Sequence, residues 1–107
     1  MRRPLVEILY IEGCANHKKA QSLVERAAGA LQLRPSVRLV EVTDAEAATR
    51  LRFLGSPTIR IDGRDVEPGA DARRDYALSC RVYRTAAGIA GQPAEGWIRD
   101  ALTRAGA

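Results

Sequence analysis

Apolar residues at the start of the chain follow first a strand spacing and then a helix spacing. Residues 5–11 form a nearly continuous apolar run, which predicts a buried strand that ends at Glu12-Gly13. Residues 15–31 then place apolar side chains three and four positions apart, with charged residues between them. This spacing predicts an amphipathic helix, one face of which packs on a sheet.

The next segment repeats the order of strand and helix. Residues 37–42 predict a second strand, and residues 44–53 predict a short helix that begins with Thr43 or Asp44 as its cap and stops before Gly55. The strands of residues 5–11 and 37–42 are joined by the helix of residues 15–31, and a connection of this length makes two neighbouring strands parallel. The first half of the chain therefore predicts a right-handed βαβ unit.

The second half has a different pattern. Residues 58–61 predict a short strand, and the turn pair Asp62-Gly63 sends the chain back antiparallel through residues 64–66. Residues 67–92 carry many charges, glycines and prolines, and no regular element is assigned to them. From Pro93 onward, apolar spacing predicts a last helix.

Size and charge narrow the possible functions. A chain of 107 residues is expected to form one domain with a single core. Its net charge of +4 is spread over alternating basic and acidic residues, and aromatic residues are few, so we predict no nucleic-acid partner. No apolar stretch approaches bilayer length, and the first residues lack the features of a signal peptide. We expect no membrane partner and a cytoplasmic location.

The sequence contains two cysteines, Cys14 and Cys80. In a reducing compartment a permanent disulfide between them is not expected. Cys14 lies at the predicted start of the first helix, where unpaired backbone N–H groups and the helix dipole favour a thiolate. Because Gly13 and the polar Asn16 flank it, we expect a reactive thiol there rather than a small buried core residue.

His17 follows Cys14 by three residues, so both side chains are expected on neighbouring turns of the helix. A charged imidazole would stabilise the thiolate, and a neutral one would accept the thiol proton. The sequence agrees equally well with a solvated surface histidine that does not act on the thiol.

Cys80 has two interpretations. It resolves a mixed disulfide on Cys14 if the two sulfurs come close, or it is a buried strand cysteine between Leu78 and Val82. Cys14, His17 and Cys80 would also suit a soft metal, but they lack the paired spacing of structural zinc sites, so no metal site is predicted.

Two motifs resemble those of the thioredoxin-like superfamily. The segment Gly13-Cys14-Ala15-Asn16-His17 is similar to the Cys-x-x-Cys turn, with His17 in place of the second cysteine, and residues 53–64 are similar to the segment around the cis-proline. The chain also resembles small, largely uncharacterised bacterial thioredoxin-like proteins, some labelled by analogy with alkylmercury lyase. Three short segments carry this resemblance: Glu12-Gly13-Cys14, residues 55–58 and residues 78–81.

The resemblance implies one thioredoxin-like α/β domain over residues 1–107, with element order β-α-β-α-β-β-α and a mixed four-stranded sheet. It implies a thiol-disulfide oxidoreductase without a cofactor, in which Cys14 is catalytic and Ser56, Pro57 and Thr58 bind substrate. His17 is a further catalytic candidate, and so is Cys80 if the two sulfurs come close. A cis Ser56-Pro57 bond would present the Ser56 backbone to an incoming chain. The expected partners are a disulfide-bearing protein or a small thiol such as glutathione. The alternative is a non-catalytic thiol module that binds a soft metal, an organomercurial-type ligand or a protein partner.

Overall fold

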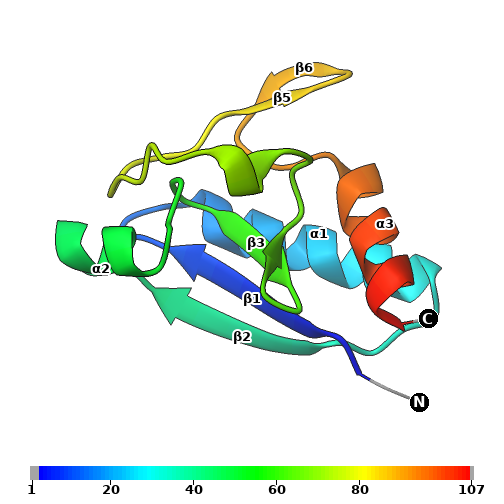
Figure 1. The fold of residues 1–107 in the computed structure, drawn as a ribbon. Helices are drawn as coiled ribbons and strands as arrows, with labels where there is room; N and C mark the ends of the chain where they lie inside the picture. The colour runs from blue at the N-terminus through cyan, green and yellow to red at the C-terminus, as the bar shows by residue number, and fades with distance from the viewer. Residues whose placement is uncertain (1–2, 107) are drawn as a thin grey trace.

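The computed structural model describes residues 3–106, which build a mixed four-stranded sheet with helices packed against it (Figure 1). The strands are β1 (Leu5–Tyr10), β2 (Ser36–Glu41), β3 (Thr58–Ile61) and β4 (Arg64–Asp65), in the spatial order β2-β1-β3-β4. β1 pairs parallel with β2 and antiparallel with β3, and β3 pairs antiparallel with β4. The predicted βαβ unit and the mixed four-stranded sheet are confirmed.

Two helices cover one face of this sheet. They are α1 (Asn16–Ala30) and α3 (Glu95–Gly106), and they pack against each other and against the strands. Side chains two positions apart in β1, Val6 and Ile8, point into this core because successive strand residues alternate between faces. Ile98 and Leu102 of α3 complete the core and are fully buried.

The opposite face carries a smaller core. Leu9 directly follows Ile8 in β1, so it points to the opposite face, toward α2 (Ala45–Arg50). Asp44 caps α2 by accepting a hydrogen bond from the backbone N–H of Ala47 at 2.8 Å. The helix ends earlier than expected because Arg52 has a φ of 55°, which an α-helix cannot contain.

The predicted start of the last helix also needs a small correction. Pro93 is buried and precedes the helix, which begins at Glu95. None of the described helices combines the length and the apolar character needed to cross a bilayer.

Regular structure in the segment 67–92 was missed at the sequence level. The segment contains a single 3-10 turn, η1 (Ala70–Ala72), and a hairpin of β5 (Tyr83–Thr85) and β6 (Gly88–Ala90). The two strands have three residues each, too few for an alternating pattern to stand out. Figure 1 shows this hairpin apart from the four-stranded sheet, on the side of η1.

Candidate functional site

The loop between β1 and α1 holds Cys14 directly before the first helical residues. Gly13 makes the turn with a φ of 81°, and the backbone N–H of Cys14 donates to the carbonyl oxygen of Ile11 at 3.2 Å. No side chain caps α1, and its first turn contains no acidic residue. The first turn of α1 therefore offers no side-chain counter-charge to the positive end of the helix dipole.

The expected exposure of Cys14 is wrong, because the residue exposes only 7% of its surface. Its neighbours Gly13 and Ala15 are exposed. The polarity of adjacent residues therefore did not reveal the direction of this side chain, which turns into the protein. A reagent reaches this thiol only if the reagent is small or if the covering residues move.

The polar partner of His17 is the backbone of Cys14 rather than its thiol. The Nδ1 atom of His17 lies 2.7 Å from the carbonyl oxygen of Cys14. The ring also stacks on Tyr10, with ring centroids 4.3 Å apart and an interplanar angle of 17°. These contacts fix the ring at the base of α1, between the end of β1 and the loop.

The loop that leads into β3 lies against the end of β1. The Ser56-Pro57 peptide bond is cis, as the resemblance implies, and Ser56, Pro57 and Thr58 are all buried. The Oγ atom of Ser56 accepts a hydrogen bond from the backbone N–H of Ile11 at 3.2 Å. Since Ile11 also binds the backbone of Cys14, the loop of Cys14 and the residue before the cis-proline share one partner.

Cys80 lies opposite Ser56 in an isolated parallel β-bridge. The Ser56 N–H donates to the carbonyl oxygen of Ser79 at 2.8 Å, and the Ser56 carbonyl oxygen accepts from the N–H of Arg81 at 2.9 Å. The fold thus connects Cys80 and the loop of Cys14 to the same serine. Both cysteines are free thiols.

The interpretation of Cys80 as a buried strand cysteine is wrong. Cys80 is exposed, and the flanking Leu78 and Val82 expose 43% and 58% of their surfaces. The alternating apolar spacing around Cys80 therefore marks the outer face of an extended segment. The inner face is formed by Arg81, which lies between Cys80 and Val82, and by Tyr83, which follows Val82; both are buried.

Arg81 is the residue of this site that sequence reasoning missed. Its side chain is 1% exposed and forms a two-point ion pair with Asp65, at 2.7 and 3.2 Å, and a second pair with Glu67 at 2.7 Å. It also donates to Thr58 Oγ1 at 3.0 Å, and its guanidinium carbon lies 4.4 Å from the Tyr83 ring centroid. Burial alone would lower the pKa of the guanidinium, but the hydrogen bonds and charges of the two carboxylates raise it.

These contacts attach the segment of Cys80 to the rest of the site. Loss of one partner from a buried ion pair typically costs about 3–5 kcal/mol, because the other charge stays buried and unpaired. Tyr83 adds a hydrogen bond from its hydroxyl to the carbonyl oxygen of Pro57.

Gly55 lies directly against the backbone of Arg81. A Cβ at Gly55 would lie 2.8 Å from the Cβ of Arg81, so only glycine permits this close approach.

A sequence signal for this ion pair did exist. Asp65 and Glu67 are separated by one residue, as are Arg81 and Tyr83. In extended chain such pairs share a face, so two acids could meet a cation and an aromatic ring across two strands.

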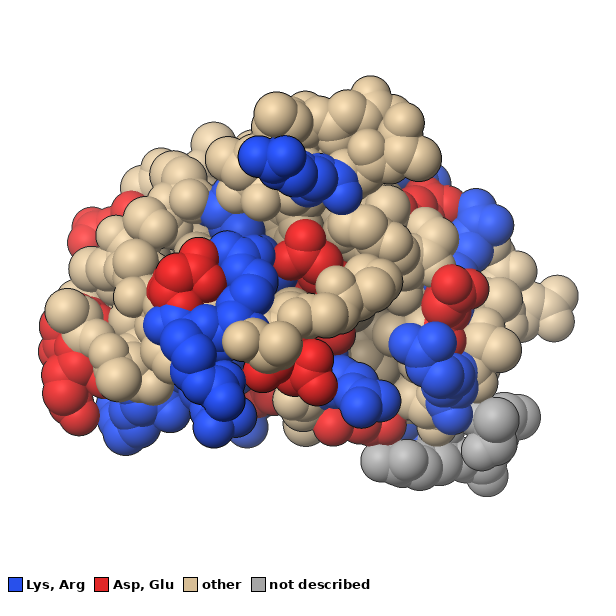
Figure 2. Space-filling view, turned by 45° about the horizontal axis from the view of Figure 1, so that its top comes forward, with Lys and Arg blue, Asp and Glu red and all other residues tan. Residues whose placement is uncertain are grey.

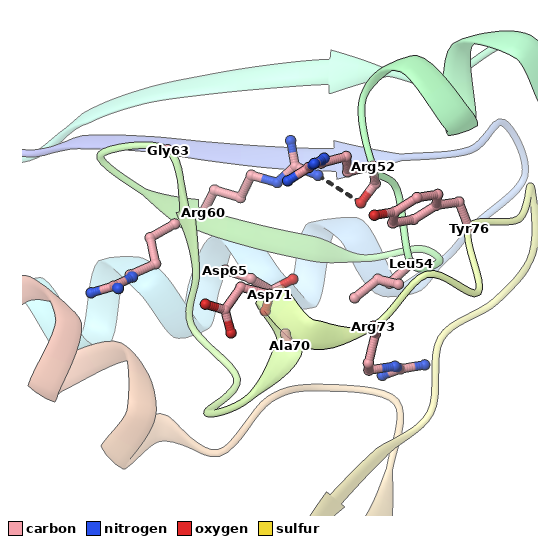
Figure 3. A pocket seen from close by; sticks show the side chains of 10 residues that line it. Arg52, Leu54, Arg60, Gly63, Asp65, Ala70, Asp71, Arg73 and Tyr76 are labelled. Atoms are coloured by element: carbon pink, nitrogen blue, oxygen red, sulfur yellow. Dashed lines mark hydrogen bonds between the residues drawn. The ribbon is translucent and has the colours of Figure 1, made fainter.

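A hollow of about 250 Å³ lies beside this site, but its lining includes neither cysteine (Figure 3). Its cations point in different directions. Arg60 donates to the carbonyl oxygens of Leu51 and Arg52, whereas Arg73 pairs with Asp75 and Glu67. The guanidinium groups do not converge on one point, so the hollow lacks the geometry of an anion site.

The charge pattern of the surface agrees with the alternation seen in the sequence. Figure 2 shows Lys and Arg side chains next to Asp and Glu side chains over the face in view.

The side chains proposed as possible metal ligands do not form a three-ligand group. Within residues 3–106, no three His, Cys, Asp or Glu side chains are arranged to hold a metal ion together. Cys80 instead lies in a backbone bridge with Ser56, Cys14 is linked to Ser56 through Ile11, and His17 is bound to the backbone of Cys14.

Comparison with models of known protein families finds no match for this chain, and comparison with curated proteins finds none either.

Proposed function

We propose that this chain is a thiol-disulfide oxidoreductase of the thioredoxin-like class, with Cys14 as the attacking thiol and Cys80 as the resolving thiol. One observation carries the proposal. Ser56 pairs through its backbone with the residues on both sides of Cys80, and through Oγ with Ile11, which in turn binds the backbone of Cys14. Both free cysteines are thereby connected through hydrogen bonds to one buried residue, which supports the proposed pairing of their thiols.

The arrangement of elements supports the thioredoxin-like class. A cysteine lies between β1 and α1, and a cis-proline precedes β3 in a sheet of order β2-β1-β3-β4. This combination agrees with the resemblance of residues 13–17 and 53–64 to thioredoxin motifs. The uncapped start of α1 supports the thiolate form of Cys14.

The proposed reaction transfers two electrons from the protein to a disulfide R–S–S–R. The Cys14 thiolate attacks one sulfur, forms a mixed disulfide and releases the thiolate of R–SH. The Cys80 thiolate then attacks the sulfur of Cys14, forms the Cys14–Cys80 disulfide and releases the second R–SH. Two molecules of a small thiol such as glutathione reduce this disulfide again and are oxidised to their own disulfide.

The proposal is tested by treating the reduced chain with hydroxyethyl disulfide and following the products by mass spectrometry. Wild type is expected to lose two hydrogen atoms and form an internal Cys14–Cys80 crosslink. Cys80→Ser is expected to stop at a stable mixed disulfide on Cys14. A wild-type protein that accumulates mixed disulfides without a crosslink would exclude the resolving role.

The order of attack is tested by comparing the two single-cysteine variants. Exposure alone predicts that Cys80 in Cys14→Ser reacts faster than the buried Cys14 in Cys80→Ser. The thiolate proposed at the start of α1 predicts the reverse order. If Cys14 is the slower thiol at neutral pH, it is not the attacking residue; if neither thiol exchanges but the pair holds a soft metal ion, the chain is a binding module.

A further inference from the structure

Recognition of an extended polypeptide by a sheet edge requires unpaired backbone groups at that edge. In the proposed site, Ser56 is the residue whose N–H and C=O would pair with such a substrate. Both groups are already used within the chain, by the Ser79 carbonyl oxygen at 2.8 Å and the Arg81 N–H at 2.9 Å. The place of a substrate strand is therefore filled by residues 79–81.

This internal strand is firmly attached. The Arg81 side chain is 1% exposed and pairs with Asp65 and Glu67, and Tyr83 donates its hydroxyl hydrogen to the Pro57 carbonyl. An incoming polypeptide could reach the Ser56 backbone only after these buried ion pairs and hydrogen bonds were broken. The exchange is unfavourable because a single substrate strand does not replace the lost side-chain contacts.

The burial of the attacking sulfur also disfavours a polypeptide substrate. Cys14 exposes 7% of its surface, so a bulky disulfide would have to displace the residues that cover the sulfur before it could align with it. A small disulfide has no such requirement. Cys80 is exposed and lies directly opposite Ser56.

We infer that the substrate is a low-molecular-weight disulfide and that residues 79–81 exclude extended polypeptides by occupying their binding edge. This inference rests on the proposed function. It assigns Cys80 a position on the internal strand that a substrate cysteine would otherwise take. Cys14 reduces the small disulfide, and the protein closes its own disulfide with Cys80, by the two exchange steps given above.

The inference is tested with two probes that contain the same reacting disulfide. One is N-acetylcysteine, and the other is a linear peptide with a central cysteine; each carries mercaptoethanol in disulfide linkage. The rate of Cys14–Cys80 crosslink formation in the reduced full-length chain is measured with each. The small probe is expected to react at least about tenfold faster, which corresponds to about 1.4 kcal/mol in the barrier.

Two results would overturn the inference and are distinguishable. Equal rates with both probes would leave the exchange activity intact and remove the size selection. Absence of the crosslink with either probe would refute the proposed function itself, and the inference with it.

A variant pair tests whether the internal strand causes the selection. Gly55→Ala places a methyl group against Arg81 and is expected to move residues 79–81 away from Ser56, which lowers the rate ratio of small probe to peptide probe. Gly69→Ala is the matched control, because Gly69 also has a positive φ, of 81°, but a Cβ there meets nothing within 4 Å. A folded Gly55→Ala protein with an unchanged ratio would contradict this role, and the wild-type ratio remains decisive if that variant does not fold.

Discussion

The Nδ1 atom of His17 lies 2.7 Å from the carbonyl oxygen of Cys14. A carbonyl oxygen can only accept a hydrogen bond, so Nδ1 carries the proton in this contact. In the neutral ring the acceptor is then Nε2, on the far side of the ring from this bond. The histidine thus positions the loop of Cys14 through its backbone, which differs both from direct action on the thiol and from a solvated surface histidine, the two alternatives left open by the spacing of three residues.

This contact predicts a small effect of His17 on thiol chemistry. His17→Phe keeps a ring that stacks on Tyr10 but removes the hydrogen bond to the Cys14 carbonyl. In the Cys80→Ser background, we expect the alkylation rate of Cys14 to change by less than about threefold, because a general base would contribute about a hundredfold or more. The rate is measured with iodoacetamide across neutral pH, and a loss of a hundredfold would identify His17 as the base.

Arg81 is expected to be among the residues most important for stability. Arg81→Met keeps an apolar stem but leaves the largely buried Asp65 without its cation, and leaves Glu67 with only Arg73. We expect a loss of about 3–5 kcal/mol in the free energy of unfolding, measured by urea denaturation.

Arg50→Met is the matched control for this prediction. Arg50 pairs with Glu46 on α2, and the two side chains are 63% and 82% exposed. An exposed pair of this kind contributes about 1 kcal/mol or less. A similar loss of unfolding free energy in both variants would show that the buried Arg81 ion pairs stabilise the protein no more than an exposed ion pair does.

Much of the central fold could be predicted because its signals are local. The apolar run of residues 5–11, the helical spacing of residues 15–31 and the turn Asp62-Gly63 each determine one element from adjacent residues. The parallel pairing of β1 with β2 then follows from the length of their connection. The position of Cys14 at the base of α1 was correct for the same reason.

Features that depend on distant residues were missed. The expected exposure of Cys14 was wrong, and so was the buried-strand interpretation of Cys80, because burial is decided by which segments cover a side chain and not by its sequence neighbours. The pairing of Ser56 with Cys80 joins residues in two loops, and no periodic pattern encodes it. Arg81 lies in the segment 67–92, to which no element was assigned, and its partner Asp65 comes from β4.

Tyr83 links the same segment to the cis-proline loop and predicts a pH dependence. Burial raises the pKa of its hydroxyl, and although the Arg81 charge opposes this shift, the Asp65 and Glu67 charges reinforce it. The hydroxyl also donates to the Pro57 carbonyl, so the folded protein retains the proton at pH values where the unfolded chain, with a pKa of about 10, releases it. A raised pKa in the folded state means that this contribution to stability is complete below pH 10 and is lost as the pH rises above it.

The prediction is measured as the difference in unfolding free energy between wild type and Tyr83→Phe. Near neutral pH the wild type is expected to be more stable by about 1–3 kcal/mol, because the variant leaves the buried Pro57 carbonyl without its donor. Above about pH 10 this difference should shrink by about 1.4 kcal/mol per pH unit, since only the unfolded wild type ionises at this position. Other titrating groups are common to both proteins and cancel in the difference. A difference that stays constant up to pH 11 would show that Tyr83 ionises as easily in the folded protein as in the unfolded chain, and that its contact with Pro57 does not hold the proton.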